Sequence, residues 1–153
     1  MLLIPLIIPT IILLPLISLI AVAFANKRQA FRISEIVAGI IFALVVSTVA
    51  IARAYGYDSL CFSLPYLQSF GINFDFELNT FNEILAVMSS IVLFAASLSA
   101  KNFIKESEKL YNSLFLVISA STLGVFLTGS LFFLYVFWEI SEVAMFFIIY
   151  IYG

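Results

Sequence analysis

The sequence predicts an all-α integral membrane protein in which residues 1–153 form a single membrane domain with five transmembrane helices. Of its 153 residues, 64% are hydrophobic and only 10% are charged, and the mean hydropathy is +1.20. A soluble domain is nearer half apolar and a quarter charged. Five apolar segments can each cross roughly 30 Å of hydrocarbon. These segments are Leu2–Phe24, Ser34–Arg53, Asn82–Ala100, Leu110–Leu127 and Leu131–Tyr152.

The composition also limits the chemistry that the chain can perform. A single cysteine, Cys61, excludes an internal disulfide and a cysteine-built metal site. The absence of histidine removes the commonest metal ligand and the usual proton shuttle near neutral pH. A formal net charge of -2 provides no basic surface, so we do not expect nucleic acid as a partner. We also expect no cofactor and no catalytic centre within this chain.

The first segment contains three prolines, Pro5, Pro9 and Pro15. Proline is tolerated in membrane helices when neighbouring groups hydrogen-bond the freed carbonyls. Ala23-Phe24-Ala25 is similar to a signal-peptidase site, but no positive charge precedes the apolar run. We therefore expect a retained helix rather than a cleaved signal.

The basic residues predict the orientation of the chain in the membrane. Six of the seven lysines and arginines lie in two loops, one after the first span and one between the third and fourth: Lys27, Arg28, Arg32, Lys101, Lys105 and Lys109. Positive charge favours the cytoplasmic side. We therefore expect these loops and the C-terminus to be cytoplasmic and the N-terminus to be external.

An external loop of residues 54–81 is expected between the second and third spans. Within it, Ile72–Asn79 alternates apolar and polar residues, which is the period of a half-buried strand. Leu60–Leu64 could pair with this segment as a short β-hairpin. Three acids near the hairpin and the start of the third span, Asp75, Glu77 and Glu83, are expected to be solvated.

Small residues on the fourth span indicate close helix packing. Ala120, Gly124 and Thr128 recur at intervals of four, a spacing that lets helix backbones approach each other. Only Thr128-Gly129-Ser130 joins the fourth span to the fifth, so these two spans are expected to form an antiparallel helical hairpin. We expect this face of the fourth span to serve helix packing rather than transport.

The fifth span carries Glu139 near its middle, with Glu142 one turn further on. A carboxylate at the bilayer centre costs on the order of 2.5–3.5 kcal/mol. Tyr135, Glu139 and Glu142 share one helix face, where the Tyr135 hydroxyl can reach Glu139. Two acids this close cannot both ionise cheaply, so one of them is expected to exchange protons near neutral pH. The alternative is that both acids contact a basic residue of a neighbouring subunit, since no lysine or arginine lies inside any span.

The segment from Leu123 to Ile140, LGVFLTGSLFFLYVFWEI, resembles the fourth-to-fifth helix signature of the antiporter-like membrane subunits. This family includes the large membrane subunits of respiratory complex I (NADH–quinone oxidoreductase), Mrp-type cation/proton antiporters and energy-converting membrane-bound hydrogenases. The resemblance implies that Glu139 corresponds to the family's essential glutamate of the fifth helix. The approach to the third span, Phe76–Phe81, is also similar, although Asn79 stands where the family usually has aspartate. Glu142 stands where the family more often has an apolar residue.

The resemblance covers only the N-terminal five-helix portion of the family, so we expect a truncated or split subunit. The broken seventh helix and the buried lysines of full-length members have no counterpart in this chain. The implied function is that of a membrane subunit in a multi-subunit redox-driven complex that translocates protons or sodium ions. Glu139 would contribute to an ion path that other membrane subunits complete.

The alternative is a non-transporting scaffold or assembly subunit of the same kind of complex, which would dock a small-residue face against its neighbour. In both cases the lipid bilayer and other membrane subunits are the expected partners. The prokaryotic plasma membrane is the favoured location, and the mitochondrial inner membrane is the alternative.

Overall fold

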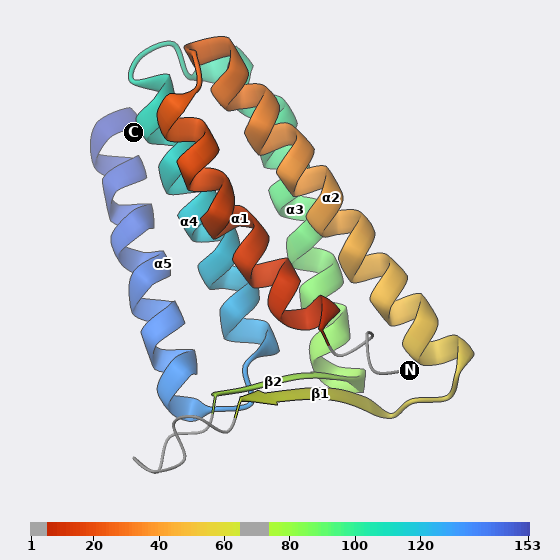
Figure 1. Ribbon diagram of the computed structural model, residues 1–153. Helices are drawn as coiled ribbons and strands as arrows, with labels where there is room; N and C mark the ends of the chain where they lie inside the picture. Colours follow the sequence, from red (N-terminus) through yellow and green to blue (C-terminus); the bar gives the residue numbers. More distant parts are fainter. Residues whose placement is uncertain (1–5, 65–73) are drawn as a thin grey trace.

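Five long helices and a two-stranded sheet make up the described part of the computed structural model, which covers residues 6–64 and 74–153 (Figure 1). Each of the five helices is long and apolar enough to cross a membrane. Residues 2–5 of the first predicted span, with Pro5, lie outside the described residues. The elements in chain order are α1 (Ile7–Phe24), α2 (Lys27–Ala54), β1 (Ser59–Leu64), β2 (Phe74–Asn79), α3 (Thr80–Phe103), α4 (Glu108–Leu127) and α5 (Leu131–Tyr152).

The start of α2 differs from the start of the span that hydropathy predicts. The helix begins at Lys27 rather than at Ser34. Asn26 and Gln29 form a capping box at this point, and the Asn26 backbone N–H donates to Gln29 Oε1 at 2.9 Å. The first two turns are polar, so a search for apolar segments detects only the remainder of the helix.

α4 is the central helix of the bundle. It packs against α1, α2, α3 and α5, whereas α5 packs chiefly against α4. In α5 only Ala144 is buried. α5 is therefore an outer helix, and Figure 1 shows it at one edge of the bundle.

The sheet closes one end of the bundle, which we call the sheet end. β1 and β2 pair antiparallel, with Phe62 opposite Phe76. Phe76 and Leu78 are buried against the helices. The Gly129 N–H donates to the Asp75 carbonyl at 2.8 Å, so the short α4–α5 connection is fixed to β2. Residues 65–73, including Ile72 of the predicted hairpin, lie outside the described residues.

A side-chain cap fixes the start of α3. Asn79 Oδ1 accepts hydrogen bonds from the backbone N–H groups of Phe81 and Asn82, at 3.0 and 3.1 Å. The Asn82 side chain in turn accepts from the Asn79 N–H at 2.7 Å and donates to the Glu77 carbonyl at 2.7 Å. This arrangement satisfies backbone donors that a helix start otherwise leaves unpaired.

Two ion pairs join α2 to α3 at opposite ends of the bundle. Arg53 pairs with Glu83 at the sheet end, and Lys101 Nζ lies 3.1 Å from Glu35 Oε1 at the other end. The prediction that Glu83 is a solvated group is wrong, because its side chain is only 12% exposed and is engaged by Arg53.

Candidate functional site

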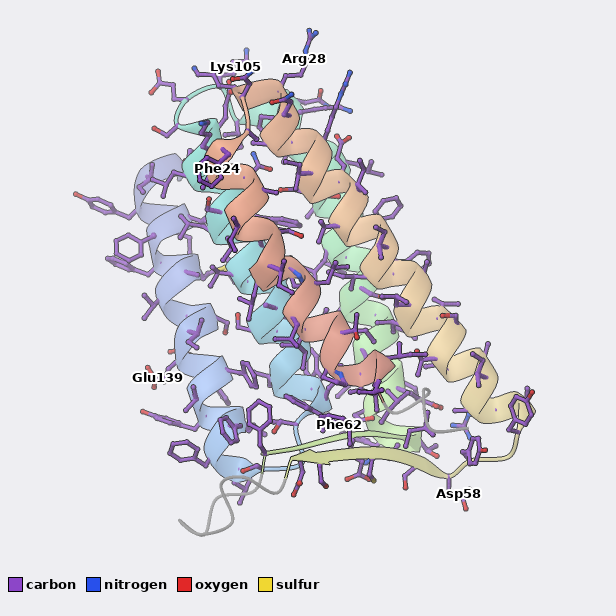
Figure 2. The ribbon with its side chains drawn as sticks, in the orientation of Figure 1. Phe24, Arg28, Asp58, Phe62, Lys105 and Glu139 are labelled. Carbon is purple, nitrogen blue, oxygen red and sulfur yellow. The ribbon has the colours of Figure 1, made fainter. Side chains whose placement is uncertain are left out.

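Glu139 lies on the outer surface of α5. Figure 2 shows its side chain projecting from the helix away from the other helices of the chain. Tyr135 and Phe146, which the helical period assigns to the same face, are 63% and 61% exposed. The predicted stripe of Tyr135, Glu139 and Glu142 is therefore an uncovered surface of the protein.

The contact between α5 and α4 explains this direction. The ring of Phe137 packs over Gly124 of α4, where an added Cβ would lie 2.6 Å from the ring. Two residues correspond to roughly 200° around an α-helix. Because Phe137 faces α4, Glu139 is turned away from this contact toward the exposed side of α5.

Apolar side chains border Glu139 on one side. Glu139 lies at the rim of a shallow depression of about 370 Å³ between α4 and α5 and is its only ionisable lining residue. A carboxylate in such surroundings is disfavoured unless it is protonated or paired. The remaining lining residues are Leu114, Val117, Ile140, Val143, Ala144 and Phe147.

Glu142 has a partner that the sequence analysis did not identify. Its carboxylate accepts a hydrogen bond from the indole N–H of Trp138, one turn earlier on the same helix. The sequence could have indicated this contact, because Trp138 and Glu142 are four residues apart and therefore lie on one helix face. The structure therefore gives the two acids different surroundings: Glu142 shares a hydrogen bond with Trp138, while Glu139 borders an apolar depression.

Neither acid has a basic partner in residues 6–64 and 74–153. The two ion pairs in this part of the chain are those that join α2 to α3. The same residues contain no group of three or more acidic, cysteine or histidine side chains that could hold a metal ion. Residues 1–5 and 65–73 contain no lysine, arginine or histidine, so a cationic side chain for Glu139 would have to come from outside residues 1–153.

Several buried hydroxyl groups donate to backbone carbonyls, whereas the buried Ser34 Oγ has no hydrogen-bond partner among the described residues. Ser90 Oγ donates to Val87 O at 2.8 Å, and Ser119 Oγ donates to Phe115 O at 2.8 Å. Ser97 makes the same kind of bond within its own helix. These hydroxyls are consistent with helix packing rather than with a polar path through the chain.

The small-residue face of α4 is occupied within the chain itself. Ala120 is 2% exposed, and Gly124 lies beneath the ring of Phe137. Thr128 Oγ1 donates to the Asp75 carbonyl at 3.3 Å, so it holds the α4–α5 connection against β2. A scaffold that docks against a neighbour would therefore need a different surface, and the exposed face of α5 is available.

Comparison with known proteins finds two relatives that match this chain over part of its length. The chain is similar to NADH-quinone oxidoreductase subunit M of Buchnera aphidicola subsp. Acyrthosiphon pisum, with 31% identity over 86 residues, 56% of this chain and 17% of the relative. It is also similar to the subunit of the same name from Buchnera aphidicola subsp. Schizaphis graminum, with 30% identity over 97 residues, 63% of this chain and 19% of the relative. No protein-family model matches the chain.

The chain thus spans less than a fifth of the length of these curated relatives. Both relatives are subunits of NADH-quinone oxidoreductase, and neither is an Mrp-type antiporter or a hydrogenase subunit. Their similarity supports a relation between this chain and the membrane subunits of complex I.

Proposed function

We propose that this chain is a membrane subunit of a multi-subunit redox-driven complex of the complex I kind. In this proposal Glu139 contributes an intramembrane carboxylate to a proton or sodium path that other subunits complete. In this proposal the chain acts as a single membrane domain, and other subunits supply the redox centres.

The observation that carries the proposal is the position of Glu139 on the uncovered face of α5. A carboxylate facing lipid at mid-membrane depth costs on the order of 2.5–3.5 kcal/mol. The exposed side chains around it include the apolar Ile140 and Val143, and the described residues offer it no cation. A neighbouring subunit that covers this face with a basic group, or with a water-filled cavity, would remove the cost and allow proton exchange.

The same surface also supports the alternative function, a scaffold without transport. α5 presents many large exposed side chains, which a neighbouring membrane chain could cover through van der Waals packing. In that case Glu139 would form a structural contact with the neighbour. The two functions differ only in whether Glu139 titrates during turnover.

Replacement of Glu139 by glutamine separates the two functions. If Glu139 carries ions, Glu139→Gln sharply lowers coupled ion translocation while the complex still assembles. Translocation is measured in proteoliposomes, and assembly is measured by co-purification of the neighbouring subunits. Glu142→Gln tests the second acid of the predicted pair, which lies one turn away and is hydrogen-bonded to Trp138. Unchanged translocation in Glu139→Gln would favour the scaffold.

We further propose that the chain lies in a prokaryotic plasma membrane with the sheet end outside and the C-terminus inside. The basic residues support this orientation, since they concentrate at the end opposite the sheet, where α2 and α4 begin. The bacterial source of both relatives supports the choice of membrane. The expected external hairpin would then consist of β1, β2 and residues 65–73 between them.

A further inference from the structure

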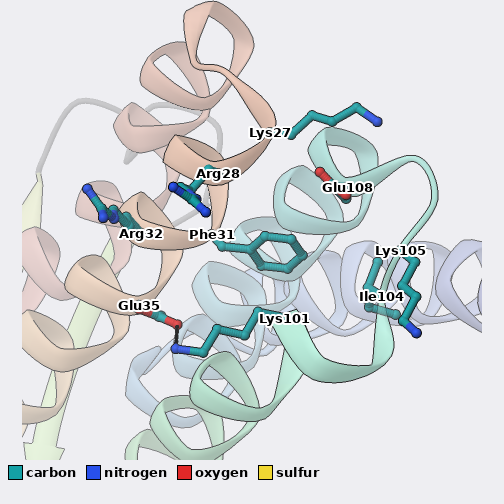
Figure 3. Close-up of a pocket in the computed structure, with 9 residues that line it drawn as sticks. All are labelled: Lys27, Arg28, Phe31, Arg32, Glu35, Lys101, Ile104, Lys105 and Glu108. Carbon is teal, nitrogen blue, oxygen red and sulfur yellow. Dashed lines mark hydrogen bonds and ion pairs between the residues drawn. The ribbon is translucent and has the colours of Figure 1, made fainter.

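A basic pocket of about 580 Å³ lies at the end of the bundle opposite the sheet (Figure 3). Its walls come from the first turns of α2, the last turn of α3 and the connection from α3 to α4. Five of its nine lining residues are lysine or arginine, and two are glutamate. The lining residues are Lys27, Arg28, Phe31, Arg32, Glu35, Lys101, Ile104, Lys105 and Glu108.

Positive charge in this pocket exceeds the negative charge that faces it. Glu35 is engaged by Lys101 at 3.1 Å, as the dashed line in Figure 3 marks. Within residues 6–64 and 74–153, neither Arg28 nor Arg32 has a carboxylate within ion-pair distance. The arginine side chains therefore offer several hydrogen-bond donors to an anion.

The start of α2 adds to the same preference. The N-terminus of a helix carries a partial positive charge and usually has acidic residues in its first turn. The first turn of α2 has no acid and contains Lys27 and Arg28 instead. An anion bound here would offset both the side-chain charges and the unpaired N–H groups of the helix start.

Apolar side chains lie next to the charged residues of this pocket. Phe31, which is 9% exposed, forms an apolar part of the pocket wall. Arg32 also lines a second depression of about 360 Å³ between α1 and α2. The other residues of that depression include Phe24, Ile33 and Ile36, of which Phe24 is 88% exposed.

We propose that the basic pocket binds the phosphate headgroup of an anionic phospholipid, whose acyl chain lies in the depression between α1 and α2. The pocket lies at the ends of helices that can cross a membrane, which is the depth of lipid headgroups. Basic pockets between membrane helices bind such headgroups. The apolar depression that shares Arg32 with the basic pocket favours a lipid over a soluble anion, because a soluble anion would use only the basic pocket. The proposal is independent of any ion transport through Glu139.

Native mass spectrometry of the full chain in detergent tests the proposal. The probes are dioleoyl phosphatidylglycerol, which is anionic, and dioleoyl phosphatidylcholine, which has the same acyl chains and no net charge. We expect phosphatidylglycerol to bind the native chain more tightly. Arg28→Gln and Arg32→Gln should each weaken its binding roughly fivefold, and phosphatidylcholine binding should not change.

Two further variants separate the pocket from general surface charge. Lys109→Gln removes one cation at the same end of the bundle but outside the pocket lining, so phosphatidylglycerol binding should stay at the native level. Glu108→Gln removes a carboxylate from the pocket and should strengthen binding by a similar factor. A gain of this kind cannot result from partial unfolding.

Three outcomes would overturn the proposal. Equal binding of the two lipids by the native chain would show that headgroup charge is not recognised. An equal loss in Lys109→Gln and Arg32→Gln would show a diffuse surface potential instead of a pocket. Displacement of phosphatidylglycerol by inorganic phosphate at the same molar concentration and constant ionic strength would identify a site for soluble anions.

Discussion

The ring of Phe137 on α5 occupies the space that a side chain at position 124 of α4 would need. A Cβ built on Gly124 would lie 2.6 Å from Phe137 Cγ and 2.7 Å from Cδ1. Both atoms belong to a rigid ring, so the contact cannot be relieved by a small rotation of a flexible chain end. The absence of a side chain at Gly124 therefore sets how closely α5 approaches the central helix, and through it where Glu139 faces.

Enlarging Gly124 should weaken the packing of α5 on α4. We expect Gly124→Ala to destabilise the chain by about 1–3 kcal/mol, the usual cost of overpacking. Gly39→Ala is the control, because the Cβ there would lie 3.3 Å from the ring of Phe94 and should cost less. Unfolding in detergent can be followed by the fluorescence of Trp138, the single tryptophan, one residue from Phe137.

A second substitution tests whether contact with Phe137 causes the destabilisation expected for Gly124→Ala. Combining Gly124→Ala with Phe137→Ala should give a loss smaller than the sum of the two single losses, because residues in contact do not act additively. Additive losses would mean that the effect of Gly124→Ala arises elsewhere in α4.

The cap at Asn79 predicts different results for two substitutions at one position. Asn79→Ala removes the acceptor of the Phe81 and Asn82 N–H groups and should lower the free energy of unfolding by about 1 kcal/mol. Asn79→Ser keeps a capping acceptor without placing a second carboxylate beside Glu77 Oε1, to which Asn79 Nδ2 donates at 3.1 Å, and should remain closer to the native value. Thermal unfolding monitored by circular dichroism measures both. Equal losses in the two variants would argue against a capping role.

The ion pair between Arg53 and Glu83 should contribute measurable coupling between α2 and α3. Exposed ion pairs contribute about 0.2–1 kcal/mol. Because the Glu83 side chain is only 12% exposed, we expect a coupling energy of about 1 kcal/mol. A double-mutant cycle with Arg53→Gln and Glu83→Gln measures it. The exchanged pair Arg53→Glu with Glu83→Arg should recover part of the stability that either single charge reversal loses.

The orientation proposed above can be tested with the single cysteine. Cys61 lies on β1 at the sheet end and is exposed. A membrane-impermeant maleimide should label it from the periplasmic side of spheroplasts. In the Cys61→Ser background, Lys105→Cys should react only after the membrane is opened, since Lys105 lies at the opposite end of the bundle. The reverse pattern would invert the orientation.

The positions of the membrane helices follow closely from the sequence. α5 has the same bounds as the predicted fifth span, Leu131–Tyr152, because Ser130 and the preceding glycine interrupt the apolar run at its start. The predicted second span begins at Ser34, whereas α2 begins at Lys27. Hydropathy detects only apolar residues, and the turns that begin at Lys27 contain several charged side chains. Local patterns therefore identify which segments are helices, and side-chain caps mark where α2 and α3 begin.

Long-range pairings did not follow from the sequence. Arg53 and Glu83 are 30 positions apart, and no local period connects them. The helical period does assign Glu139 and Tyr135 to one face of α5. It does not indicate whether that face is turned toward the bundle or away from it. That direction depends on the contact between Phe137 and Gly124, which belongs to the packing of two helices.

The two ion pairs on α2 and α3 lie at matching intervals. On α2 they involve positions 35 and 53, and on α3 positions 83 and 101, so the interval is 18 residues on each helix. At 1.5 Å per residue this is about 27 Å, close to the roughly 30 Å thickness of a bilayer's hydrocarbon core. Charged pairs fixed at this interval can both lie at the membrane surfaces only when the hydrocarbon core has a matching thickness. Movement of the helix pair along the membrane normal would bring one of the two charged pairs into the hydrocarbon core. The depth of the whole chain in the membrane, and of any subunit docked on α5, would then be determined by the ion pairs of α2 and α3.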